Sequence, residues 1–383
     1  MRQADLIVIG AGILGTFHAY FAARKGYKTL LLERNAFPND ASVRNFGILS
    51  PTIVPIESAW ASYAFDSLEI YRALQREHDL TVREAGSLYL ASNEVENRVL
   101  QEFAQRALTA YRCSYLDARE ATSRFSFVQP SYCAGALLFP DDLTVDSPHL
   151  LRRLIPRLEA AGKVEYIPHA TVIGVTASGE GCTVTDARGR VFAATRVIVC
   201  SGAEYRTLSP ELFASSGLQV CKLQMMRTIP LPGFRLPHAV LGGLSIGRYP
   251  AFALSPSYDA LRAQPVPAAL HDNGIHVLFK QAPDGSIVIG DSHEYRECGD
   301  VEGLEERTNP AINEAILAYG RLMLRLPSWA IGSMWNGYYL VNPGHDIFTR
   351  TIDGAVHIVT GIGGKGMTTG PGFARHSIET LLR

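Results

Sequence analysis

The chain has 383 residues, with 36 Lys or Arg and 37 Asp or Glu, so its formal net charge at neutral pH is -1. A single hydrophobic core stops growing near ~250–300 residues, and this length therefore predicts two domains. The balanced charge offers no basic surface for nucleic acid or an anionic membrane, so an anionic ligand would have to meet a few local cations.

The segment from Leu6 to Ala23 is largely apolar, but glycines interrupt it, and it lacks a small-residue cleavage pattern. A strand, turn and helix explain it better than a signal peptide or membrane span. The six cysteines show no CxxC pairing and no companion His at metal-ligand spacing, which predicts reduced thiols and no metal. We therefore expect a cytoplasmic protein without a membrane or nucleic-acid partner.

The hydrophobic pattern predicts the following elements in chain order. A strand over 6–9, a helix over 16–25 and a strand over 28–33 form one βαβ unit. Further along, the pattern predicts helices over 60–78, 93–111 and 147–161, and strands over 87–91, 164–167, 171–176, 183–186 and 196–200. Frequent Pro and Gly with alternating apolar residues then predict antiparallel strands over 275–279 and 286–289, and a last buried strand spans 356–359.

The pattern of a buried strand followed by glycine occurs near the start, near 200 and near 360. It predicts an α/β fold with a discontinuous Rossmann-like domain and an inserted antiparallel-sheet domain. We expect residues 1–82, 145–215 and 333–383 to form the nucleotide-binding domain, and residues 83–144 and 216–332 to form the substrate-binding domain.

Gly10, Gly12 and Gly15 form a GxGxxG motif between the first strand and helix. The first glycine permits the tight turn, the second lets a pyrophosphate approach the backbone, and the third lets helix and strand pack closely. Phosphates favour a helix N-terminus, and Glu33, at the end of the next strand, is placed to accept hydrogen bonds from ribose hydroxyls. The motif predicts a dinucleotide site.

A glycine-rich loop over 361–368 follows the last buried strand and leads into a helix. An enzyme that binds a nicotinamide cofactor does not need its C-terminal segment to come back to the nucleotide-binding domain. Backbone N–H groups and Lys365 would stabilise the pyrimidine edge of a flavin, because this edge becomes negatively charged when the flavin is reduced. The loop therefore favours FAD over NAD.

Four segments, 5–15, 41–47, 197–203 and 361–368, resemble the FAD-dependent oxidoreductases of the D-amino-acid oxidase, glycine oxidase and sarcosine oxidase superfamily, and 140–146 resembles that family's crossover back into the nucleotide domain. The resemblance spans essentially the whole chain. It implies that 42–47 wraps the isoalloxazine, that Val172 contacts the adenine, and that Gly202 lies near the adenosine. With the motifs above, the expected FAD-binding residues are Gly10, Gly12, Ile13, Leu14, Gly15, Glu33, Arg34, Ser42, Arg44, Asn45, Phe46, Gly47, Val172, Ser201, Gly202, Gly361, Gly363, Gly364, Lys365, Gly366, Met367 and Thr368.

Two departures from the family carry information. Tyr339 stands where an arginine usually clamps the carboxylate of amino-acid substrates, and tyrosine cannot replace two parallel charge-assisted bonds. Ordinary D-amino acids are therefore disfavoured as substrates. Residues 333–346 contain no Cys through which some relatives attach FAD, so we predict non-covalent FAD.

The segments 221–227, 44–47 and 363–366 resemble a subgroup associated with bacterial phosphonate breakdown. This resemblance implies oxidation of 2-aminoethylphosphonate derivatives, notably N-methylated ones, and so a small anionic amine as partner. A tetrahedral phosphonate suits several separated cations better than one planar fork. The predicted substrate-binding residues are Arg44, Lys222, Gln224, Arg227, Trp335, Tyr339 and Lys365, each with a purely structural role as its alternative.

Flavin chemistry predicts hydride transfer from the C–H beside the neutral amine to flavin N5, hydrolysis of the imine to phosphonoacetaldehyde and an amine, and reoxidation by O2 to give H2O2. Lys365, Tyr339 and His293 are the candidate catalytic residues, and His293 or His276 would accept the amine proton. The strand over 287–290 lacks the lysine that some oxidase relatives carry there. An FAD dehydrogenase or oxidase of a small amino acid or 2-hydroxy acid, using a non-oxygen acceptor, therefore stays open, as does a non-catalytic nucleotide-binding module.

Overall fold

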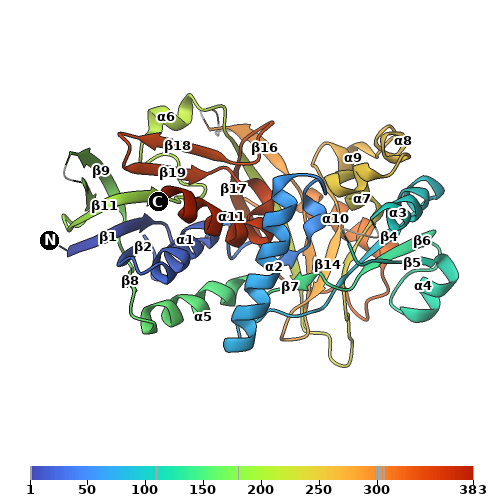
Figure 1. Cartoon of the computed structure of the whole chain (residues 1–383). Coiled ribbons are helices and arrows are strands. Elements are labelled where there is room, and N and C mark those ends of the chain that lie inside the picture. The colour runs from blue at the N-terminus through green and yellow to red at the C-terminus, as the bar shows by residue number, and fades with distance from the viewer. Residues whose placement is uncertain are drawn as a thin grey trace.

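The computed structural model describes residues 2–107, 111–179, 181–298, 300, 304 and 307–382. These residues form two large sheets and one short two-stranded sheet, and the large sheets lie toward opposite ends of an elongated molecule (Figure 1). The short sheet pairs β3 (Ile48–Leu49) with β7 (Leu143–Thr144). The two-domain division and its predicted boundaries stay a prediction.

The first sheet is mostly parallel and has the β1 strand at its centre. Strand β1 pairs with β11 on one side and with β2 on the other, and β19 and β8 extend the sheet in parallel beyond β11 and β2. An antiparallel hairpin and one antiparallel edge strand complete it. Its strands are β1 (Arg2–Ile9), β2 (Thr29–Leu32), β8 (Val164–Ile167), β9 (Val172–Ser178), β10 (Gly181–Asp186), β11 (Val191–Val199), β18 (Phe348–Ile352) and β19 (Val356–Thr360).

Helices from both ends of the chain cover one face of this sheet (Figure 1). The helices are α1 (Ile13–Arg24), α2 (Ala59–Glu77), α5 (Ser147–Ala160) and α11 (Gly366–Leu381), with the short α6 (Pro210–Ala214) elsewhere. Phe17 of α1 meets Tyr71 of α2 edge to face, with ring centroids 5.8 Å apart. Gly372 lets α11 cross α2 closely, because a Cβ there would lie 2.3 Å from the Tyr63 carbonyl oxygen.

The second sheet is largely antiparallel and runs in the order β16-β12-β15-β14-β13-β4-β6-β5, with β17 also paired to β12. Its helices lie mainly over the outer strands (Figure 1). The strands are β4 (Ser87–Ala91), β5 (Ser114–Asp117), β6 (Gly135–Phe139), β12 (Gln219–Thr228), β13 (Ala239–Leu241), β14 (Leu278–Gln281), β15 (Ile287–Gly290), β16 (Glu294–Glu297) and β17 (Ile331–Val341). The helices are α3 (Glu94–Arg106), α4 (Ala118–Arg124), α7 (Gly243–Arg248), α8 (Tyr258–Arg262), α9 (Ala268–His271) and α10 (Pro310–Met323), with 3₁₀ turns η1 (Pro51–Ile53), η2 (Pro250–Leu254) and η3 (Gly363–Lys365).

Three local predictions differ from the structure. Helix α1 begins at Ile13, three residues before the predicted start, because the Ser42 hydroxyl accepts the first N–H of the helix. Residues 275–277 precede β14 and bond to neighbouring loops. For the predicted helix over 93–111, α3 ends at Arg106, and residues 108–110 lie outside the described residues.

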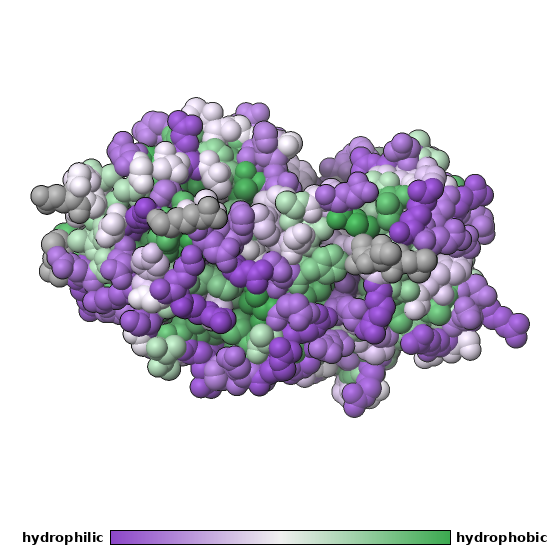
Figure 2. All heavy atoms as spheres, in the orientation of Figure 1, coloured by the Kyte–Doolittle hydropathy of each residue, from purple (hydrophilic) through white to green (hydrophobic). Residues whose placement is uncertain are grey.

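Most of the surface seen in Figure 2 is hydrophilic, with apolar patches scattered between charged side chains. Within the described ranges, no helix is both long and apolar enough to cross a membrane. The six cysteines are free, and five of them are buried.

Candidate active site

A cavity of about 480 Å³ lies between the first sheet and the second. A smaller cavity of about 170 Å³ continues from it along the carboxyl ends of β1, β2 and β11. The two cavities share the lining residues Gly12, Ala41, Ser42, Cys200 and Gly202. Together they form one elongated space that begins beside Glu33 and ends among side chains of the second sheet.

The GxGxxG turn forms the narrow middle of this space. Gly10 has a φ of 94°, and a Cβ on it would lie 2.3 Å from the Cys200 carbonyl oxygen. A Cβ on Gly15 would lie 1.8 Å from the Gly10 carbonyl oxygen, so only glycine lets α1 pack this closely. Gly12 lines both cavities, next to the N-terminus of α1. The turn therefore places a helix N-terminus where phosphates would be stabilised.

Glu33 lies at the small end of the space and is 6% exposed. One carboxylate oxygen accepts the Ala11 N–H at 3.0 Å and the other accepts the Asn35 N–H at 3.0 Å. These bonds fix the carboxylate at the edge of the smaller cavity, where ribose hydroxyls would reach it. Arg34 also lines that cavity and forms ion pairs with Asp40 and Glu204.

The loop over 42–47 forms one side of the larger cavity. The Asn45 side chain donates to the Ala41 carbonyl at 2.9 Å and accepts from the Ser147 hydroxyl at 2.7 Å, which fixes the loop. Gly47 has a φ of 80°, and a Cβ there would meet the Val145 carbonyl oxygen at 2.3 Å. The loop therefore presents a preformed edge to a planar ring.

The C-terminal loop forms the opposite side, since every residue from Thr360 to Met367 lines the larger cavity. Gly361 and Gly363 have φ values of 69° and 67°, which L side chains rarely adopt. The Lys365 ammonium lies 3.3 Å from Asp346 and 5.1 Å from the Trp60 ring centre, and burial lowers its pKa. Helix α11 begins at the next residue.

The two ends of the chain meet at this cavity. Strand β19 pairs with β11, and β11 pairs with β1, so the loops that follow them leave the same edge of the sheet. A Cβ on Gly366 would lie 3.8 Å from Ile13, and one on Gly370 would lie 3.6 Å from it. The elongated space, the helix N-terminus and the two glycine-rich loops fit an FAD molecule.

Almost all of the predicted FAD-binding residues line the joined cavities. Gly15 lies beneath the turn, and Thr368 is buried in the first turn of α11. The remainder are Gly10, Gly12, Ile13, Leu14, Glu33, Arg34, Ser42, Arg44, Asn45, Phe46, Gly47, Val172, Ser201, Gly202, Gly361, Gly363, Gly364, Lys365, Gly366 and Met367.

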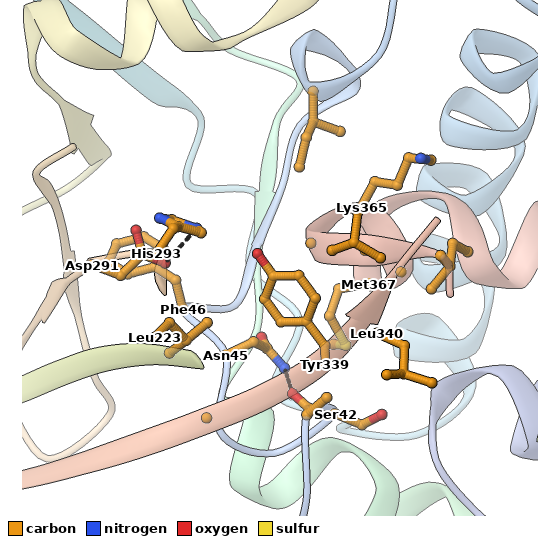
Figure 3. Close-up of a pocket in the computed structure, with 18 of the residues that line it drawn as sticks. Ser42, Asn45, Phe46, Leu223, Asp291, His293, Tyr339, Leu340, Lys365 and Met367 are labelled. Atoms are coloured by element: carbon orange, nitrogen blue, oxygen red, sulfur yellow. Dashed lines mark hydrogen bonds and ion pairs between the residues drawn. The ribbon is translucent and has the colours of Figure 1, made fainter. Parts of the chain in front are cut away.

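The far wall of the larger cavity comes from the second sheet and α7. Tyr339 of β17 projects toward the C-terminal loop, its hydroxyl 3.4 Å from where a Cβ on Gly364 would lie. Figure 3 shows it between Lys365 and the Asp291–His293 pair. Arg248, at the end of α7, donates to the Tyr295 hydroxyl at 3.3 Å. Burial acts against its charge, but Tyr295, Tyr339 and Asp291 outweigh burial and raise the pKa of Arg248.

Arg248 is a cavity cation with few protein partners and no carboxylate bonded to it among the described residues. Among the described residues, its guanidinium has one hydrogen-bond acceptor, Tyr295, whereas Lys365 is paired with Asp346. Arg262 also lines the cavity and donates to the Gly247 carbonyl. Arg248 therefore keeps most of its five N–H donors for an anion in the cavity.

Three predicted substrate-binding residues on β12 do not line the larger cavity. The Lys222 ammonium donates to the Arg307 carbonyl at 3.1 Å and lies 3.4 Å from Glu294. Gln224 bonds to Asn309 and Asn313. Arg227 pairs with Asp284 at 2.9 Å and contacts Ser286. Each side chain is engaged in holding elements of the second sheet together.

Arg44 and Trp335, which were also predicted to bind substrate, both contact the loop over 42–47 or β17 and differ in which cavity they line. Arg44 lines the larger cavity, but its guanidinium donates to the carbonyls of Asn39 and Asn336. Trp335 donates to the Arg44 carbonyl at 3.1 Å and lines a third cavity, of about 260 Å³. Arg227 lines this third cavity too. These two residues fasten the loop over 42–47 to β17.

Lys280 is a buried cation that the sequence analysis did not single out. Its ammonium lies 2.6 Å from the Val145 carbonyl oxygen, lines the third cavity, and sits 5.6 Å from the Phe46 ring centre. Burial lowers the pKa of Lys280 to about 7. Lys280 lies opposite Val288 in the neighbouring strand. It therefore supplies a cation beside the strand over 287–290, which itself has no lysine.

The sequence analysis also missed Arg248, Asp291 and Tyr295, and it weighed His276 only as an alternative to His293. These residues come from α7, β16 and the segments flanking β14 and β15. No local motif marks them, because only the pairing of β14 with β15 and the packing of α7 bring them to one wall.

A family model described as FAD dependent oxidoreductase matches residues 5–380. Glycine oxidase of Geobacillus kaustophilus (strain HTA426) is 25% identical over 214 residues, which cover 53% of this chain and 55% of that protein. The tRNA 5-methylaminomethyl-2-thiouridine biosynthesis bifunctional protein MnmC of Aeromonas hydrophila is 24% identical over 218 residues, covering 55% of this chain and 32% of that protein. The alignments thus span about half, or less, of these relatives.

Solved structures of similar fold cover nearly the whole chain. Glycine oxidase from Geobacillus kaustophilus has a TM-score of 0.78 at 16% identity and covers 99% of this chain and 95% of its own. L-alpha-glycerophosphate oxidase from Mycoplasma pneumoniae with FAD bound has a TM-score of 0.78 at 17% identity, with coverage of 100% and 96%. The family match, the shared fold and the geometry of the joined cavities agree. The chain belongs to the FAD dependent oxidoreductase family, and FAD is its cofactor.

Proposed function

We propose that this FAD-dependent oxidoreductase oxidises a small aminophosphonate such as N-methyl-2-aminoethylphosphonate or 2-aminoethylphosphonate. The observation that carries the proposal is Arg248, a cation with one protein acceptor on the cavity wall opposite the C-terminal glycine loop. Tyr295 and Tyr339 lie beside it, and Arg262 and Lys365 add charge to the same cavity. Separated cations and hydroxyls suit a tetrahedral anion that carries up to two charges.

Tyr339 also supports an amine without a carboxylate. It occupies the position where the family usually has the arginine fork, and its hydroxyl faces Gly364. Burial raises the pKa of Tyr339 well above its usual value, so the hydroxyl stays protonated and can donate to a phosphonate oxygen.

His293 is proposed to accept a hydrogen bond from the neutral amine. Its Nδ1 lies 3.0 Å from the Gly274 carbonyl oxygen, which can only accept, so Nδ1 carries the ring proton. Burial lowers the pKa of His293 to about 3, which keeps the ring neutral and leaves Nε2 with a free lone pair, and His293 lines the larger cavity. Bound FAD supplies the hydride acceptor, and the chain's residues hold the neutral amine and its C–H in place.

We propose O2 as the final electron acceptor, giving H2O2. Lys280 supports this part of the proposal, because its ammonium lies beside Phe46 and Gly47 in the loop expected to surround the isoalloxazine. A nearby cation favours electron transfer to O2, since the first product is an anion. The second candidate is a dehydrogenase or oxidase of a small amino acid or 2-hydroxy acid with another acceptor. The absence of a lysine on the strand over 287–290 favours this candidate.

Steady-state assays with N-methyl-2-aminoethylphosphonate, 2-aminoethylphosphonate, glycine and sarcosine test the proposal. We expect the phosphonates to give phosphonoacetaldehyde, an amine and H2O2 in equal amounts. Turnover of the carboxylates alone would reject the aminophosphonate. Aldehyde formation without H2O2, dependent on an added dye, would assign another acceptor.

A further inference from the structure

Two histidines and one aspartate meet on the wall of the larger cavity, at the ends of β14 and β15. His276 and Asp291 face each other because their backbones exchange hydrogen bonds, N–H to carbonyl at 3.2 and 3.0 Å. The His293 N–H donates to the Asn273 carbonyl at 2.8 Å. These backbone hydrogen bonds therefore bring all three side chains to the same wall of the cavity, although the residues are separated in the sequence.

The side-chain atoms of this cluster converge on one point. His276 Nε2 lies 3.1 Å from Asp291 Oδ1, and His293 Nε2 lies 3.8 Å from Asp291 Oδ2. The two imidazole rings stack at 5.2 Å, and one possible ligand atom from each residue lies within 4.8 Å of the others. All three residues are buried, at 4–8% exposure. The 3.1 and 3.8 Å separations lie on either side of the ~3.4 Å spacing of tetrahedral donor atoms around one ion with bonds of ~2.0–2.1 Å.

The outer nitrogens of both rings have partners that orient the inner ones. His293 Nδ1 is held by the Gly274 carbonyl, and His276 Nδ1 lies 3.1 Å from the Ser245 hydroxyl. Histidines that bind metals usually have their second nitrogen held in this way. These contacts hold both rings on the cavity wall, with Nε2 as the nitrogen near Asp291 in each.

The arrangement leaves electron-rich atoms facing one another. The Nε2 of neutral His293 carries a lone pair and lies 3.8 Å from the Asp291 carboxylate, which also carries lone pairs. Asp291 Oδ1 is buried and accepts no hydrogen bond, despite the 3.1 Å approach of His276. Buried polar atoms in native proteins are rarely left unsatisfied, so a positive group between them would resolve the conflict.

We propose that His276, Asp291 and His293 form a binding site for a divalent transition-metal ion of the Zn²⁺ type. Two imidazoles and one carboxylate are the ligands of three-coordinate protein sites that leave a further position open, here toward the cavity. A bound ion would occupy His293 Nε2 on the wall of the larger cavity. Since the proposed function gives that nitrogen a contact with the amine, we expect the metal to inhibit turnover.

Arg248 sets the strength of this site. Its charge interacts with all three residues, and Asp291 supplies the only negative charge among the ligands. A cation beside the site disfavours a metal ion, so we expect moderate affinity in the native enzyme and tighter binding in Arg248→Gln.

Equilibrium dialysis of chelator-treated holoenzyme against Zn²⁺, with zinc counted by mass spectrometry, tests the site. We expect one zinc per chain in the native enzyme and none at that site in Asp291→Asn or His293→Ala. Ser245→Ala should bind ~10–100-fold more weakly, since it removes an outer partner. His238→Ala, which removes a histidine bonded to the Ala85 carbonyl, should bind like the native enzyme.

FAD absorbance verifies that each variant is folded, and the binding measurement needs no amine, so it succeeds or fails independently of the proposed substrate. FAD-loaded native enzyme that takes up no stoichiometric zinc would overturn the site. Equal zinc uptake by Asp291→Asn, His293→Ala and the native enzyme would also overturn it. Zinc that binds without slowing amine turnover would overturn the inhibitory role.

Discussion

The two ends of the joined cavity are built in different ways. At the nucleotide end, shape and backbone dominate: Gly10 and Gly15 permit contacts that no Cβ would allow, and Glu33 is held by N–H groups. At the substrate end, side chains such as Arg248 and His293 provide the chemistry. They come from segments that are far apart in the sequence, namely α7 and the residues after β15. Substitutions at the first end should therefore affect folding and FAD retention, whereas substitutions at the second should affect kinetics.

Gly15→Val should have the largest effect. A Cβ at this position would lie 1.8 Å from a backbone oxygen, so we expect the free energy of unfolding to fall by more than ~3 kcal/mol, with loss of bound FAD. Thermal unfolding and flavin content measure both effects. Gly174→Ala, where a Cβ meets no atom within 4 Å, should stay within ~0.5 kcal/mol. A Gly15→Val enzyme with native stability would contradict the steric account.

Arg248→Met should reduce kcat/KM for the aminophosphonate ~10–150-fold, because a charge-assisted hydrogen bond is worth ~1.5–3 kcal/mol. FAD content should stay native, which separates this end of the cavity from the other. Arg227→Met is the matched control, since its guanidinium pairs with Asp284 outside the larger cavity. Equal losses in the two variants would remove the special role of Arg248.

Glu33→Ala should raise the FAD dissociation constant ~10-fold by removing the ribose acceptor, an effect of ~1.5 kcal/mol. Flavin fluorescence during dialysis or titration measures it. Glu165→Ala removes an exposed carboxylate on the neighbouring strand and should not change FAD affinity. Undiminished FAD retention in Glu33→Ala would count against the ribose contact.

Lys280→Met should give the smallest effect, slowing reoxidation by O2 ~5-fold, as expected for an interaction of ~1 kcal/mol. Burial lowers the pKa of Lys280 to about 7, with Asp146 opposing and Arg227 reinforcing that shift. The lysine is charged below this pH and neutral above it, so the native reoxidation rate should fall as pH rises through 7. Stopped-flow traces of Lys280→Met should lack this pH dependence; an unchanged dependence would exclude Lys280.

The sequence predicts the nucleotide end well because its determinants are local. A strand, a spaced set of glycines and one acid lie within the first 33 residues, and the C-terminal loop is equally continuous. The substrate end is different. Lys222 and Gln224 have the right chemistry on the right strand, but they bond to the segment over 307–313. Arg248 lies on a short helix without a motif, and only tertiary packing places it beside Tyr295.

An anaerobic absorbance titration of the purified enzyme tests the central claim most directly, because it reports FAD and substrate in one cavity. We predict that N-methyl-2-aminoethylphosphonate or 2-aminoethylphosphonate bleaches the flavin band, and that glycine and sarcosine leave it unchanged at equal concentrations. Bleaching by the carboxylates alone, or a colourless protein that takes up no added FAD, would contradict the account.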